Sequence, residues 1–128
     1  MAAAWGWLTR HRRAVLVAAV LAVSAWWFSA YPRGVTAAWV DAARGHDEIQ
    51  AYGYPEPKRF ESARLLRERY GVHTNTVAGC VVTYELRWYV SGYNSVSIPN
   101  INARHGKDVF EECYEEAFVA WRRDQPRE

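Results

Sequence analysis

The sequence predicts an α+β protein in two parts: an N-terminal transmembrane helix, and one small domain of about three to four helices and a short sheet. Three observations support this class. An apolar run without charge follows a basic cluster, three later segments have helical periodicity, and two segments between them are rich in β-branched or aromatic residues. Of the 128 residues, about 95 remain beyond the apolar run, which is enough for a single core.

The apolar run covers residues 14–31 and contains no charged side chain. As a helix it would rise about 27 Å, close to the 30 Å hydrocarbon core of a bilayer. We expect Pro32 and Gly34 to stop this helix. Aromatic and basic side chains at both ends match the residues that favour a membrane interface, and they are Trp5, Trp7, Arg10, Arg12, Arg13, Trp26, Trp27 and Tyr31.

The distribution of charge around the run predicts its orientation. Arginines cluster before it, whereas Arg33 and Arg44 beyond it are fewer and accompanied by Asp41. The positive-inside rule therefore places the N-terminus in the cytoplasm. The predicted organisation is a cytoplasmic tail (1–13), a transmembrane helix (14–31), a juxtamembrane helix or linker (32–45) and an exported α+β domain (46–124).

Two alternatives remain for the same run. A basic start, an apolar stretch and the small residues Val23-Ser24-Ala25 also fit a secretory signal that is cleaved. The run could instead be a buried helix of a soluble protein. The anchor is the preferred interpretation, because cleavage would leave an exposed Trp26-Trp27-Phe28 terminus.

The first half of the domain alternates between helical and extended patterns. Residues 35–44 favour a helix, and residues 46–54 a strand, although a helix there stays an alternative. Residues 60–70 form the clearest amphipathic helix, with Gly71 placed as its C-terminal cap. The β-branched segment 72–81 predicts a second strand.

Two more helical segments complete the domain. Thr83 is a predicted N-cap, and the helix after it contains Gly92, which weakens the pattern or marks a close contact. We expect Pro99 to open a separate short turn that ends near Gly106. Residues 108–123 predict the last helix. The acidic residues Glu111, Glu112, Glu115 and Glu116 in its early turns are interpreted as a solvated face.

Charge also excludes a class of partner. All 14 acidic residues follow residue 31, so the domain is near neutral although the whole chain carries +2. A nucleic-acid-binding domain would concentrate its positive charge on the folded part. We therefore expect a lipid bilayer and another envelope protein as partners, and no nucleic acid. The preference for arginine over lysine is usual in GC-rich bacterial genomes, and the predicted location is the bacterial inner membrane.

The predicted location determines which oxidation state we expect for the two cysteines. In an oxidising compartment Cys80 and Cys113 predict one disulfide, and closing a loop of about 34 residues would stabilise the domain by roughly 3.7 kcal/mol. Alternatives are two buried thiols, a metal site with His73 and His105, or a nucleophilic Cys80 with a histidine as base. The spacing of these residues matches no paired zinc signature.

Four residues in segments with turn chemistry are candidates for partner binding, because tyrosine is enriched at interfaces: Tyr52, Tyr54, Tyr93 and Asn94. Motifs for phosphate loops, serine hydrolases and zinc proteases are absent from the sequence. We predict no cofactor and no catalytic residue. The preferred function is an accessory or interaction subunit of the envelope, followed by a small-ligand or peptide-binding module, and third by a thiol- or histidine-dependent enzyme.

Overall fold

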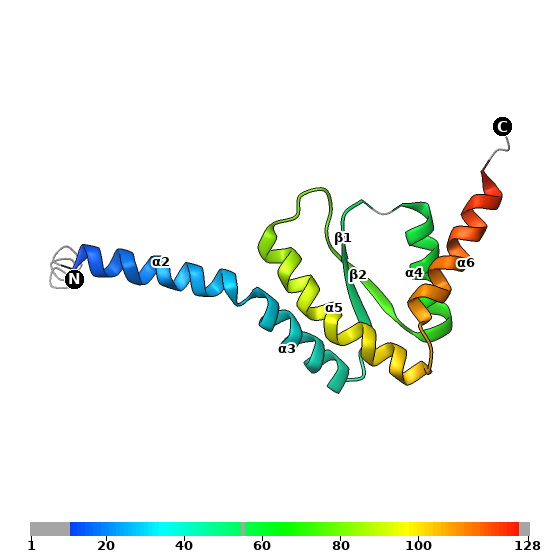
Figure 1. Ribbon diagram of the computed structural model, residues 1–128, viewed down its shortest axis with the longest axis horizontal. Helices are drawn as coiled ribbons and strands as arrows, with labels where there is room; N and C mark the ends of the chain where they lie inside the picture. Colours follow the sequence, from blue (N-terminus) through cyan, green and yellow to red (C-terminus); the bar gives the residue numbers. More distant parts are fainter. Residues whose placement is uncertain (1–10, 55, 126–128) are drawn as a thin grey trace.

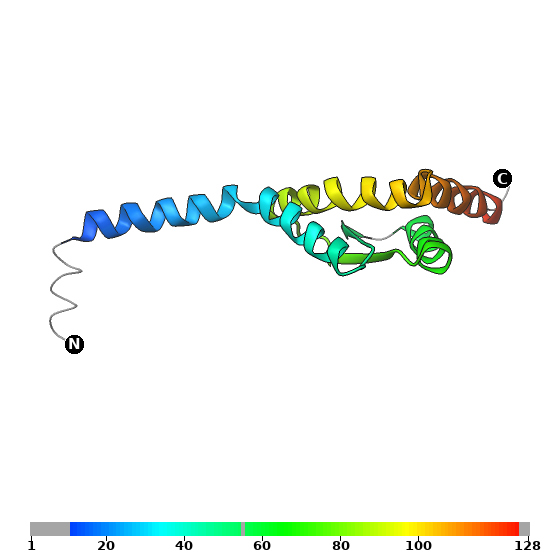
Figure 2. The ribbon, with the colours of Figure 1, turned by 90° about the horizontal axis from the view of Figure 1, so that it is seen from below.

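The computed structural model describes residues 11–54 and 56–125. They form five helices and a two-stranded parallel sheet, which confirms the predicted α+β class. The first helix, α2 (Arg12–Phe28), projects from the rest of the molecule as a single rod (Figures 1 and 2). The remaining elements pack together at one end of this rod.

The second helix, α3 (Ala30–Ala43), continues directly from α2 after a break at Ser29 and a bend of 49°. Within residues 11–54 and 56–125, no single helix is both long and apolar enough to cross a membrane. By length and composition alone, α2 and α3 meet that criterion as a bent pair. The transmembrane helix therefore stays a prediction.

The expected helix stop at Pro32 and Gly34 is wrong, because both residues lie inside α3. Pro32 is the third residue of the helix, where a backbone N–H has no partner within the helix and its loss is harmless. The actual break is made at Ser29, whose hydroxyl donates to the carbonyl oxygen of Trp26 at 2.7 Å.

Helix α3 packs along α5 (Tyr84–His105), and glycines allow the two backbones to touch. A Cβ atom on Gly34 would lie 2.1 Å from the carbonyl oxygen of Tyr89, and one on Gly92 would lie 2.2 Å from that of Tyr31. Residues 32–45 were predicted as a juxtamembrane helix or linker. In the structure they contain most of a helix that is part of the packed domain.

Helix α5 runs without interruption through Pro99, so the expected separate turn is wrong. The helix tolerates the lost N–H because its length and its packing on α3 hold the neighbouring turns. Its ends were predicted correctly. The Thr83 hydroxyl accepts from the Leu86 N–H at 3.2 Å, and Gly106 caps the C-terminus with φ of 67°.

The sheet is a β–α–β unit made by β1 (Glu48–Tyr52), α4 (Pro57–Tyr70) and β2 (His73–Ala78). Parallel strands need a long crossover, which α4 supplies. Pro57 begins α4 and Gly71 ends it in the left-handed conformation, at φ of 67°.

The core lies at the end of the domain farther from α2, where α6 (Val109–Asp124) packs on α4 (Figure 1). Asp108 caps α6 by accepting from the N–H groups of Phe110 and Glu111. The core cluster joins α4, α5, α6 and the residue before β2, and consists of Leu65, Leu66, Val72, Ile101, Val109, Cys113 and Ala117.

Candidate functional site

An open cavity of about 240 Å³ lies between one face of the sheet and α4. The strand register pairs Ile49 with Thr74 and Ala51 with Thr76, and paired residues of a parallel ladder point to the same face. These four side chains line the cavity on the sheet side, and Phe60 lines it on the α4 side. We call this cavity, together with its extension described next, the α4 groove.

The groove continues along α4 toward the beginning of β2. A second hollow of about 270 Å³ shares Phe60, Ala63 and Thr74 with the first, and is also lined by Arg64, Arg67 and His73. Phe60 stays 62% exposed. The Thr74 hydroxyl is buried and makes no hydrogen bond to any residue in the described part of the chain. A largely apolar surface therefore runs along α4, with an unpaired hydroxyl buried beneath it.

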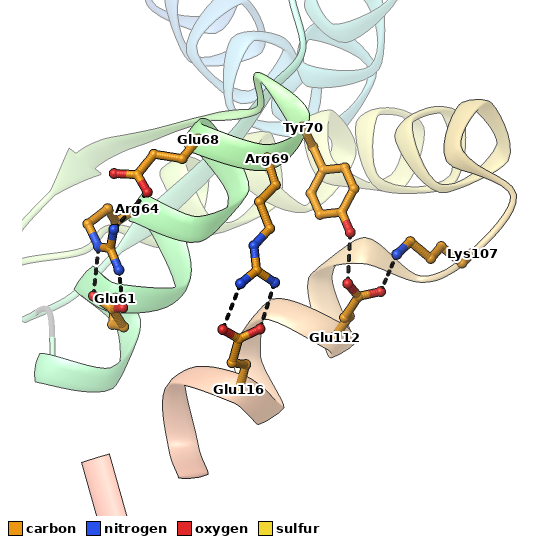
Figure 3. A network of polar contacts seen from close by, with 8 residues as sticks. All are labelled: Glu61, Arg64, Glu68, Arg69, Tyr70, Lys107, Glu112 and Glu116. Atoms are coloured by element: carbon orange, nitrogen blue, oxygen red, sulfur yellow. Dashed lines mark hydrogen bonds and ion pairs between the residues drawn. The ribbon is translucent and has the colours of Figure 1, made fainter. Parts of the chain in front are cut away.

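Several charged side chains of α4 are already paired, as Figure 3 shows. Arg64 binds Glu61 and Glu68 on its own helix. Arg69 reaches across to α6 and donates two hydrogen bonds to Glu116, at 2.6 and 2.7 Å. The Arg69–Glu116 contact joins α4 to α6, whereas both pairs of Arg64 lie within α4. We call the contacts of Arg69, Tyr70 and Lys107 with Glu112 and Glu116 the α4–α6 seam.

Opposite charges shift the pKa values in this seam. Hydrogen bonds from Lys107 and then Tyr70 lower the pKa of the Glu112 carboxyl, and the Arg69 guanidinium lowers that of Glu116. The hydroxyl of Tyr70 donates to Glu112 at 2.8 Å. The acidic face of α6 is therefore partly used to hold α4.

Three arginines line the groove, and two of them differ from Arg64, which is paired within α4. Arg59 and Arg67 are exposed, and neither forms an ion pair with any residue in 11–54 or 56–125. They stand eight residues apart on α4, with Ala63 midway between them. Residues four apart share one helix face. The wall of the groove thus presents two uncompensated positive charges on either side of a small residue.

The two edges of the sheet also differ. At the outer edge of β1, the amide of Asn94 substitutes for a strand: it accepts from the Gln50 N–H at 2.9 Å and donates to the Gln50 carbonyl at 2.7 Å. On β2, the His73 N–H points inward to Asp47, so the alternate residue Thr74 directs its N–H and C=O outward. Nothing in the described residues pairs with that edge. The open edge of β2 borders the groove.

The four predicted partner-binding residues separate into two pairs. Tyr52 lines the groove, and Tyr54 beside it is 79% exposed. Tyr93 is buried instead, with its hydroxyl donating to Asp41 at 2.7 Å, and Asn94 closes the β1 edge. These last two residues are corrected from partner binding to the packing of α5, because the helix face they occupy turns inward.

The predicted disulfide is absent: both cysteines are free, Cys80 exposed and Cys113 fully buried. Cys113 shares the core cluster with Val72, and β2 carries the chain about 20 Å onward before Cys80. A disulfide requires Cα atoms within about 7 Å. Burial raises the pKa of the Cys113 thiol, which opposes formation of a thiolate.

The predicted metal candidates are also apart. His73 lies at the groove, whereas the His105 ring packs against Tyr70 at 4.9 Å between centroids. Among the described residues, no three His, Cys, Asp or Glu side chains are grouped to hold a metal ion.

The predicted membrane-interface residues fall partly outside the description, since Trp5, Trp7 and Arg10 precede residue 11. Arg12 and Arg13 begin α2 and are exposed. At the other end, aromatic side chains surround the junction of α2 with the domain. We call them the aromatic collar, and it consists of Trp26, Trp27, Tyr31, Tyr84 and Trp88.

Sequence reasoning missed Tyr84 and Trp88, whose four-residue spacing on the outer face of α5 was the available signal. They are 72% and 61% exposed, and the rings of Trp88 and Tyr31 meet edge to face at 6.4 Å. The Arg33 guanidinium lies 4.0 Å above Trp26 and pairs with Glu85. The collar thus joins α2, α3 and α5.

Comparisons with family models, curated proteins and solved structures found no match to this chain. The functional inference therefore rests on geometry. The groove offers backbone hydrogen bonds, apolar contacts and positive charge, all of which are means of binding.

Proposed function

We propose that this protein is a membrane-anchored interaction module of the bacterial envelope. Helix α2 holds it in the inner membrane with the N-terminus in the cytoplasm, and the domain presents the α4 groove to a partner protein outside. The observation that carries this proposal is the bare surface of α2. None of its residues is buried, and Leu16, Val20 and Leu21 are each more than 60% exposed.

Such a surface needs an apolar environment. Burying one large aliphatic side chain is worth about 1.5–3 kcal/mol, and α2 leaves a whole helix circumference uncovered. Its 17 residues span about 25 Å, so the flanking turns would complete a span. Indole and phenol rings favour the headgroup region, and the collar places them where α2 meets the domain.

Membrane retention tests the anchor. We expect the full chain to stay with the membrane fraction after extraction at alkaline pH. Val20→Arg places a charge in the middle of α2, which costs about 2.5–3.5 kcal/mol in a membrane, and it should shift protein into the soluble fraction. Val119→Arg on α6 is the matched control, because Val20 and Val119 are both exposed, at 64% and 52%. Equal behaviour of the two variants would contradict the anchor.

The orientation has its own test, because Cys80 is exposed and Cys113 is buried. A membrane-impermeant maleimide added to cells with a permeable outer layer and an intact inner membrane should label Cys80. Cys80→Ser should abolish the signal. Labelling that appears only after the inner membrane is lysed would place the domain in the cytoplasm and overturn the proposed topology.

A peptide-binding role is the second candidate, and the α4 groove favours it. The groove combines an open strand edge with an apolar wall, which is the arrangement that extended peptides use when they add to a sheet. This role is compatible with membrane anchoring. It makes the proposed interaction module more specific, because it states how a partner would be bound.

A further inference from the structure

The open edge of β2 and the row of residues on α4 face the same groove. The edge supplies outward backbone groups at Thr74 and, by alternation, at Thr76. An unpaired edge of this kind is a template for another strand. The opposite edge is closed by Asn94, so in the described part of the chain strand addition has one place to occur.

The row on α4 sets the spacing of the charges that fit. Arg59 and Arg67 are eight helical residues apart, which corresponds to about 12 Å along the axis. In an extended peptide, residues i and i+4 lie about 13 Å apart and point to the same face. Two carboxylates at that spacing match the two guanidinium groups.

The residue between those carboxylates meets different chemistry. Position i+2 of the peptide points to the same face and falls opposite Ala63, where the helix wall is lowest, next to the exposed ring of Phe60. A medium-sized apolar side chain fits there. The groove therefore selects an acidic, apolar, acidic pattern at alternate positions.

We propose that the α4 groove binds an extended acidic peptide segment of a partner protein, which adds to the outer edge of β2 as a third strand. Its carboxylates at positions i and i+4 pair with Arg59 and Arg67, and its i+2 side chain packs on Ala63 and Phe60. This inference rests on the proposed role as an interaction module and names the chemistry of the partner.

The test uses the full chain in nanodiscs of neutral phosphatidylcholine, and a fluorescent peptide of sequence Thr-Glu-Thr-Val-Thr-Glu-Thr. Anisotropy should show saturable binding that weakens with salt. The same peptide with Lys in place of both Glu should bind at least tenfold more weakly. The variant Arg59→Glu/Arg67→Glu should reverse this preference. Arg122→Glu/Arg123→Glu, the same charge change at the exposed end of α6, should leave it intact.

Strand addition is tested without changing the protein. N-methylation of the alternate backbone amides that would face β2 removes the ladder hydrogen bonds and should weaken binding at least tenfold, whereas N-methylation of the amides facing away should not. Equal effects of the two modifications would overturn strand addition.

Several other results would also overturn the proposal: absence of binding at millimolar peptide, equal affinity for the Glu and Lys peptides, or a dimer in the nanodisc whose β2 edges are occupied by each other. Membrane retention and Cys80 labelling are measured separately. If the protein passes those two tests and does not bind the peptide, the proposal of an acidic peptide ligand is refuted and the anchored topology is retained.

Discussion

The close contact between α3 and α5 predicts an unusual effect of replacing glycine by alanine on the stability of the protein. In the interior of an ordinary helix, Gly→Ala stabilises by about 1 kcal/mol. Gly34→Ala should instead destabilise, because the new Cβ atom would lie 2.1 Å from the Tyr89 carbonyl oxygen, where ordinary contacts are 3.4 Å or longer. The helices would have to separate by about 1.3 Å.

The size of the effect follows from what blocks the new methyl group. Overpacking costs about 1–3 kcal/mol, and the upper end applies because the obstacle is backbone and cannot rotate away. Subtracting the gain in helix propensity leaves a net loss of about 2 kcal/mol in the free energy of unfolding. Gly92→Ala, which meets the Tyr31 carbonyl oxygen at 2.2 Å, should lose a similar amount.

The measurement is a urea titration of the full chain in detergent, followed by circular dichroism. Gly79→Ala is the control, since a Cβ atom there meets nothing within 4 Å and the residue has no positive φ; its stability should change by less than about 0.5 kcal/mol. The double variant Gly34→Ala/Gly92→Ala should lose less than the sum of the single losses, because one separation of the helices relieves both clashes. A Gly34→Ala protein as stable as the wild type would refute the close contact.

Three further predictions concern the thiols, the closed sheet edge and the seam between α4 and α6. Without reductant, Cys80 should react at once with a maleimide and Cys113 only after unfolding, so mass spectrometry should find one label and then two; two labels appearing only after reduction would restore the disulfide. Asn94→Ala leaves the N–H and C=O at the β1 edge unpaired and should lower the free energy of unfolding by about 1–3 kcal/mol; an unchanged urea midpoint would contradict this pairing. Because the pKa values of Glu112 and Glu116 are lowered below 4.5, their stabilisation is complete above that pH and is lost as the pH falls through the lowered values. Replacing both by Gln should flatten this acid limb of the stability curve, and an unaltered limb would argue against the seam.

Local chemistry was the part of the fold that could be predicted. Gly71, Thr83 and Asp108 mark helix ends through interactions within a few residues, so a short stretch of sequence contains the whole signal. Both strands and the last helix were found for the same reason. Their parallel pairing required the crossover through α4, which no single segment reveals.

Interactions between distant segments account for the errors. Gly34 was interpreted as a helix stop, but its reason lies 55 positions away, at the Tyr89 backbone. Pro99 likewise sits in a helix that its neighbours hold together. The disulfide failed on distance, because a strand separates the two cysteines along the domain.

The candidate site shows the same division. Tyr52, which was predicted to bind a partner from its turn chemistry, lies in the lining of the groove, and its role stays a prediction. Arg59, Phe60 and Thr74 were missed, because each is ordinary in its own segment and acquires meaning only when α4 crosses over the sheet. Arginines at helical spacing could have indicated a charged face, and the sequence does predict the Arg64–Glu68 pair from their four-residue spacing. It does not show that Arg59 and Arg67 lack such a partner among the described residues.

The direct junction between α2 and α3 bears on how a partner reaches the groove. Many anchored domains are joined to their membrane helix by a flexible linker and sample a volume above the bilayer. Their effective concentration near a partner therefore depends on the length of the linker. Here a single residue, Ser29, separates the two helices, and α3 is locked to α5. With α2 in the bilayer, as proposed, the groove would stay at a nearly constant distance from the membrane surface and in a nearly constant orientation. Because the groove would not reorient, the flexibility needed for binding must come from the partner. Its acidic segment must then be long and mobile enough to reach the groove.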